Sequence, residues 1–223
     1  MIGGLVALKI DPDILTGLGS GRRTVVITGT NGKSTTTSLV HHILTEAGVP
    51  VATVYCAAGD LNGSKGDHFD THADNFNKLK NNMLPPFDQA ASALVEDLEQ
   101  RGRLDETLIV MLTDFGRTPQ INKGAGRDHF PGVYSAVFAG GGIRGGQVYG
   151  KSNPTGHEPA EQACGPPDLH ATIFHALGID PDHMIYDAAD RPLPLCAGKP
   201  RSRKVVASAA LIPIEEWPLI DGN

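Results

Sequence analysis

The pattern of apolar and polar positions predicts strands that alternate with helices. Residues 24–30 are mostly β-branched and apolar and end in a glycine loop, which is typical of a buried strand. Apolar residues recur at helical spacing over residues 34–47, Gly48 ends this helix, and residues 49–55 predict a second strand. The N-terminal part therefore reads as a β-loop-α-β unit of about 55 residues.

Two helices are predicted after a polar, glycine-containing joint at residues 59–66. The first begins after Asp70 and runs to Asn82, and the second runs over residues 87–101, where one apolar stripe follows the helical repeat. Between them stand Pro85 and Pro86, which we expect to break the helix because proline lacks a backbone N–H.

The remaining pattern indicates further strands and one more helix. Residues 107–112 are a continuous apolar run, which is typical of a strand covered on both faces, and residues 134–139 predict another strand. Asp168 is expected to cap a helix that ends at Gly178. Alternating strands and helices predict an α/β fold with a layered, mainly parallel sheet flanked by helices.

Composition narrows the classes of function. The chain has 223 residues, of which 40% are hydrophobic and 20% charged, so it is long enough for a packed core. Its formal charge of −6 argues against a general nucleic-acid binder. No apolar run approaches the roughly 18 residues that span a bilayer, and no leader peptide is recognised, so we expect a cytoplasmic protein with no membrane partner.

A glycine loop follows the first predicted strand and has the residue types of a phosphate site. Glycines allow close approach of the ligand, Lys33 supplies positive charge, and the hydroxyl of Ser34 or Thr35 suits magnesium. The backbone amides lie at a helix N-terminus, where the helix dipole favours an anion. The candidate nucleotide-binding residues are Gly29, Thr30, Asn31, Gly32, Lys33, Ser34 and Thr35.

The loop sequence Thr28-Gly-Thr-Asn-Gly-Lys-Ser-Thr-Thr-Thr resembles the ATP loop of the Mur ligase family. The segments before it, Leu8-Lys-Ile-Asp-Pro-Asp and Gly21-Arg-Arg, resemble the MurT-like type of that family. That resemblance implies binding of Mg-ATP and an ancestry in enzymes that act on peptidoglycan precursors. It covers only about residues 1–55, without the rest of the ligase sheet or the C-terminal ligase domain.

A second constellation combines carboxylates with histidines. Asp70 and His72 lie two positions apart, so in an extended segment both side chains leave the same face. Asp114 directly follows the apolar run 107–112, at the carboxyl end of a strand, where α/β sheets bind ligands. Carboxylate and imidazole groups together suit zinc or manganese. Arg117, three residues after Asp114, is the candidate catalytic residue that binds an anionic oxygen.

These residues belong to motifs that resemble the C-terminal part of an uncharacterised, sulfatase-like bacterial family in the alkaline-phosphatase superfamily, over about residues 67–198. By that resemblance Asp70, His72, Asp114 and His129 are the candidate metal ligands, His157 and Glu158 are weaker candidates, and His170 is structural. The motifs are Phe69-Asp-Thr-His-Ala-Asp-Asn, Thr113-Asp-Phe-Gly-Arg-Thr-Pro, Gly126-Arg-Asp-His-Phe and Asp168-Leu-His-Ala-Thr-Ile.

Together the two resemblances predict a composite chain. Residues 1–58 are a truncated Mur-like segment, 59–66 a joint, 67–198 the sulfatase-like part, and 199–223 a tail without a motif. The half that carries the superfamily nucleophile is missing, so we expect at most a weak metal-dependent hydrolase of phosphate or sulfate esters. The alternatives are an ATP-binding ligase fragment and an inactive fusion product. The expected ligand is a small anionic ester or a nucleotide.

Overall fold

The structure, a computed structural model, describes five stretches of the chain. Within them lie most of the predicted sulfatase-like part and two strands of the N-terminal part. The predicted loop residues Thr30 to Thr35, the helix expected at 34–47, the joint 59–66, and Asp114 lie outside the described residues. The described ranges are 24–29, 50–55, 69–113, 115–186 and 189–200.

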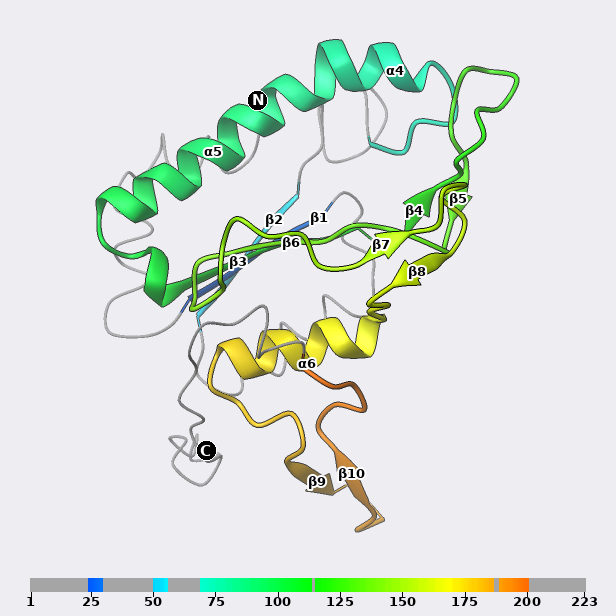
Figure 1. The fold of residues 1–223 in the computed structure, drawn as a ribbon. Coiled ribbons are helices and arrows are strands. Elements are labelled where there is room, and N and C mark those ends of the chain that lie inside the picture. Colours follow the sequence, from blue (N-terminus) through cyan, green and yellow to red (C-terminus); the bar gives the residue numbers. More distant parts are fainter. Residues whose placement is uncertain (1–23, 30–49, 56–68, 114, 187–188, 201–223) are drawn as a thin grey trace.

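Four strands form the main sheet, in the order β2-β1-β3-β6 (Figure 1). Strand β1 (Thr24–Gly29) pairs in parallel with β2 (Val51–Tyr55) on one side and with β3 (Thr107–Met111) on the other. Strand β6 (Val137–Ala139) pairs antiparallel with β3 at the edge. The predicted Mur-like and sulfatase-like segments therefore contribute neighbouring strands to one sheet. A wider layered sheet stays a prediction.

Strand β3 and helix α6 (Pro166–Ala176) build the buried core. Leu108 and Val110 alternate along β3 and belong to the same buried cluster as Ile173 and Phe174 of α6. Each of these four side chains is at most 2% exposed. Ile109 is buried as well but lies outside this cluster, as the alternation of side chains along a strand requires. Figure 1 shows α6 on one side of the sheet and the long helix α5 on the other.

The predicted break at Pro85 and Pro86 is wrong, because the helix continues through this pair. A short α4 (Asn75–Asn77) leads into a π-helical segment η1 (Lys78–Met83) and then into α5 (Leu84–Gln100). At the junction the N–H of Leu84 bonds to the carbonyl of Leu79, five residues back. Both prolines stand in the first turn of α5, directly after the π-helical segment, in which hydrogen bonds reach five residues back instead of four.

Helix α6 begins three residues earlier than predicted, and its N-cap is Gly165, not Asp168. Asp168 stands at the third helical position, where its Oδ2 accepts the N–H of Gly165 at 3.1 Å. Pro166 and Pro167 occupy the first turn, where a missing N–H leaves no helical hydrogen bond unmade because Gly165 before them is extended. Gly178, with φ 81°, follows the helix end as expected.

Shorter elements complete the described part. A 3₁₀ turn, η2 (Leu104–Glu106), precedes β3. The strand expected at 134–139 is reduced to β6, since only its last three residues pair with β3. Three small antiparallel pairs are β4 (Gly116–Arg117) with β5 (His129–Phe130), β7 (Lys151–Ser152) with β8 (Pro159–Glu161), and β9 (Met184–Tyr186) with β10 (Pro192–Pro194). None of the helices in the described ranges is both long and apolar enough to cross a membrane.

Candidate metal centre

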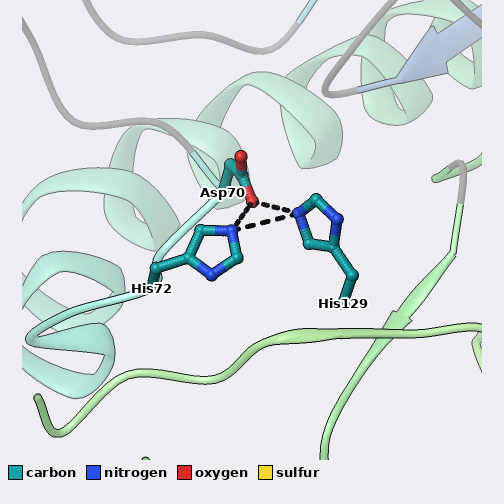
Figure 2. A group of neighbouring side chains, drawn as sticks. All are labelled: Asp70, His72 and His129. Carbon is teal, nitrogen blue, oxygen red and sulfur yellow. Dashed lines mark hydrogen bonds and ion pairs between the residues drawn. The ribbon is translucent and has the colours of Figure 1, made fainter.

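An extended segment before α4 places two candidate ligands on one side of the backbone. Thr71 is 2% exposed, whereas its neighbours Asp70 and His72 are exposed. This alternation is the period-2 pattern that the Asp-x-His spacing predicts. The side chains of Asp70 and His72 meet, with 3.0 Å between Asp70 Oδ1 and His72 Nε2 (Figure 2).

The third candidate ligand arrives from the β4–β5 pair. Gly116 and Arg117 of β4 lie opposite Phe130 and His129 of β5. Figure 1 shows this pair beside the start of α4. His129 Nε2 lies 2.8 Å from Asp70 Oδ1 and 3.1 Å from His72 Nε2.

Asp70, His72 and His129, hereafter the triad, therefore direct one atom each toward a common centre (Figure 2). The three distances between Asp70 Oδ1, His72 Nε2 and His129 Nε2 are 2.8, 3.0 and 3.1 Å. The side chains are 35, 48 and 45% exposed, so a solvated ion can reach the centre from outside. No other group of three or more potential ligands is found among the described residues.

Arg117 holds the carboxylate of the triad. Its Nη2 donates to Asp70 Oδ1 at 2.5 Å, and its Nη1 donates to the carbonyl of Arg127 at 3.3 Å. Burial alone would raise the pKa of Asp70, but hydrogen bonds from His129 and Arg117 outweigh burial and lower the pKa to about 2. Asp70 is thus ionised at neutral pH, as a metal ligand must be.

His72 has a second partner, Asp128. His72 Nδ1 lies 2.9 Å from Asp128 Oδ1, and this hydrogen bond, followed by one from Asn122, lowers the pKa of Asp128. A neutral His72 ring that donates from Nδ1 keeps its lone pair on Nε2, toward the centre of the triad. Such carboxylate–histidine pairs commonly orient metal-bound histidines.

The donor set and its spacing fit a divalent metal ion. Zinc binds imidazole nitrogen and carboxylate oxygen at about 2.0–2.2 Å, so ligands of one ion lie roughly 2.8–3.1 Å apart in an octahedral arrangement and 3.3–3.6 Å apart in a tetrahedral one. The three distances between the triad atoms match the octahedral arrangement directly, and a widening of about 0.2–0.8 Å gives the tetrahedral one.

The structure thus brings together three of the four predicted ligands and Arg117, while Asp114 lies outside the described residues. The weaker candidate His157 contacts Gln120 instead, with 3.0 Å between His157 Nε2 and Gln120 Nε2. Two residues of the site, Asn122 and Asp128, are absent from the predicted ligand set. A signal for Asn122 exists in the sequence, since asparagine with glycines two and four residues later is typical of a turn that caps its own backbone.

Comparison with protein families gives one match that covers most of the chain. A family model described as "Protein of unknown function (DUF1501)" matches residues 20–206. This range includes β1, β2 and the triad.

Comparison with curated proteins gives short matches to UDP-N-acetylmuramoylalanine–D-glutamate ligases. The ligase of Zymomonas mobilis is 75% identical over 32 residues, 14% of this chain and 7% of the ligase. That of Paramagnetospirillum magneticum is 47% identical over 60 residues, 26% of this chain and 13% of the ligase. That of Solibacter usitatus is 76% identical over 29 residues, 13% of this chain and 7% of the ligase. The chain therefore spans only 7–13% of the length of these relatives. No solved structure matches.

Proposed function

The chain belongs to the DUF1501 family of proteins of unknown function, and from that premise we propose that residues 67–198 form a metal-binding, sulfatase-like domain. It acts at most as a weak hydrolase of phosphate or sulfate esters. The observation that carries the proposal is the triad, in which one carboxylate oxygen and two imidazole nitrogens lie within 3.1 Å of one another.

The arrangement is more than a surface cluster of polar groups. Asp70 is held by Arg117, and His72 is held by Asp128, so both ligands have a partner that fixes their orientation. The two imidazole Nε2 atoms lie 3.1 Å apart, and in the tautomers that carry lone pairs on both atoms a cation between them accepts both. Zinc and manganese both accept this donor set.

An anionic ester suits the charge around the triad. The chemistry that a bound divalent ion supplies in such a site is polarisation of an ester oxygen. Arg117 uses two N–H groups on Asp70 and the Arg127 carbonyl, and the guanidinium has five, so others remain for an anionic oxygen. Arg117 thus first positions Asp70 and then adds positive charge beside the substrate.

Turnover is expected to be weak because no free nucleophile is seen near the triad among the described residues. The hydroxyls of Thr71, Thr113 and Thr118 each donate to a neighbouring oxygen. An attacking hydroxyl instead needs a base that takes its proton.

The first test is metal binding by the full chain. After chelation, the protein is titrated with zinc or manganese, followed by elemental analysis and a thermal melt. An ion at about 100 times its Kd adds roughly 2.7 kcal/mol, or a rise in Tm of about 5–10 °C for a chain of this size.

His72→Ala should lose the metal and the rise in Tm, whereas His157→Ala should keep both, since His157 contacts Gln120 and not the triad. Equal metal content in wild type and His72→Ala would show that the triad is not the site.

A second candidate function is nucleotide binding by residues 29–35, favoured by the short matches to the ligases. It predicts that wild type binds Mg-ATP and that Lys33→Ala does not. Isothermal titration with Mg-ATP decides this, and the His72→Ala variant serves as the control because its loop is intact. Equal binding by wild type and Lys33→Ala would refute this candidate.

A further inference from the structure

The side chain of Asn122 uses all four of its hydrogen-bonding positions. Its Nδ2 donates to the carbonyl of His72 at 2.9 Å and to Asp128 Oδ1 at 3.1 Å. Its Oδ1 accepts the N–H groups of Gly124 and Gly126, each at 2.9 Å. An amide side chain has two donor hydrogens and two acceptor lone pairs, so Asn122 is fully satisfied.

The loop that Asn122 closes is fastened to the segment that carries the triad. The N–H of Arg127 donates to the carbonyl of Thr71 at 3.1 Å, and the N–H of Asp74 donates to the carbonyl of Gly124 at 2.9 Å. At Gly126 the two backbones touch, because a Cβ added there would lie 1.9 Å from the carbonyl oxygen of His72. The shape of the loop therefore decides where the His72 backbone lies.

Asn122 also acts on the His72 ring through Asp128. Asp128 Oδ1 accepts from Asn122 Nδ2 and contacts His72 Nδ1, so the amide fixes the acceptor that orients the imidazole. We propose that Asn122 is a positioning residue that sets the orientation of His72 toward a bound metal ion, an inference that rests on the proposed metal site.

The experiment is a double-mutant cycle on cobalt(II) affinity in the full chain, with zinc competition as a second reading. Asn122→Ala, Asp128→Ala and the double variant are compared with wild type. Loss of a group that orients a ligand typically costs 10–100-fold in metal affinity. Since Asn122 acts partly through Asp128, the double variant should lose less than the product of the two single losses.

Two further variants separate positioning from folding. Asn122→Asp keeps the acceptors for the two glycine N–H groups but loses both donors and places a second carboxylate beside Asp128. It should fold, bind cobalt at least 10-fold more weakly and alter the cobalt absorption spectrum. Asn153 is the matched control, because its Oδ1 caps another loop by accepting from His157 N–H and Thr155 Oγ1, and Asn153→Ala should leave the cobalt spectrum unchanged.

The outcomes are distinct. Cobalt affinity of Asn122→Asp within about twofold of wild type would overturn the inference and leave the metal site standing, as would losses in the cycle that simply multiply. Absence of cobalt and zinc binding by wild type would overturn both. If Asn122→Ala does not fold, Asn122→Asp alone decides, because it keeps the hydrogen bonds that close the loop.

Discussion

The β3–α6 core and the triad are held together by different interactions. In the core, Val110 and Phe174 are at most 2% exposed and pack against other apolar groups. In the triad, His72 and His129 are nearly half exposed, and hydrogen bonds and close backbone contact keep the side chains in place. Apolar burial is non-directional, whereas hydrogen bonds specify atoms and angles. The core thus supplies stability, whereas the triad depends on directional contacts for its geometry.

A large truncation in the core should separate these two roles most strongly. Phe174→Ala removes one of the largest fully buried side chains and is expected to lower the free energy of unfolding by about 3–5 kcal/mol. Urea unfolding followed by circular dichroism measures this loss. At temperatures where the variant stays folded, zinc affinity should be unchanged, because Phe174 belongs to the core cluster and not to the triad.

The control is Val148→Ala, since Val148 is 95% exposed and its truncation should change the free energy of unfolding by less than about 0.5 kcal/mol. A loss from Phe174→Ala no larger than that of the control would show that α6 does not anchor the core.

Two glycines in one loop test how far the geometry of the triad depends on close approach of the two backbones. A Cβ at Gly126 would lie 1.9 Å from the His72 carbonyl oxygen, whereas a Cβ at Gly124 has its nearest neighbour at 3.4 Å. Gly126→Ala should therefore push the loop from His72, lower the free energy of unfolding by about 1–3 kcal/mol and weaken zinc binding at least 10-fold. Gly124→Ala should do neither. Similar zinc affinities for the two variants would contradict the proposed role of the backbone contact.

The stability of the β3–α6 core and that of the triad should also depend on pH in different ways, and this is the smallest of the expected effects. Burial lowers the pKa of His170 in α6, and its Nε2 is buried without a hydrogen-bond partner. The unfolded chain then binds a proton more readily than the folded protein, so stability falls as the pH drops through about 6.5. Asp70, with its pKa lowered to about 2, stabilises the folded state above about pH 3.8 and loses this contribution as the pH falls toward 2.

Thermal melts from pH 8 to pH 3 measure both contributions. His170→Phe should reduce the change in Tm between pH 7.5 and 5.5, to which His175 also contributes because burial lowers its pKa as well, and should not alter the change below pH 4. Asp70→Asn should reduce only the change in Tm below pH 4. An unchanged profile for His170→Phe would show that the buried ring is not the group that titrates.

The sequence predicted correctly those helix and strand boundaries that depend on neighbouring residues alone. The apolar run at 107–112 predicted β3, because a strand that is buried on both faces needs apolar residues throughout. Gly178 predicted the end of α6, because glycine favours the left-handed backbone that ends a helix. The same reasoning failed at Pro85 and at Asp168. In both places two prolines stand in the first turn of a helix. The sequence does not show where that first turn begins, because this depends on the backbone hydrogen bonds of the preceding residues.

The chain by itself determined which residue types are available for a metal site, and the two-residue spacing places Asp70 and His72 on one face wherever the backbone is extended. That the backbone is extended there, with α4 beginning only at Asn75, was decided by the structure. Only the tertiary structure decided that His129, 59 positions after Asp70, completes the triad. Likewise, only the folded loop places the Asn122 amide between Asp128 and the His72 carbonyl. Both are contacts between segments that lie far apart in the sequence. Such contacts form only when the chain between them folds back, and no local pattern of side chains predicts how it does so.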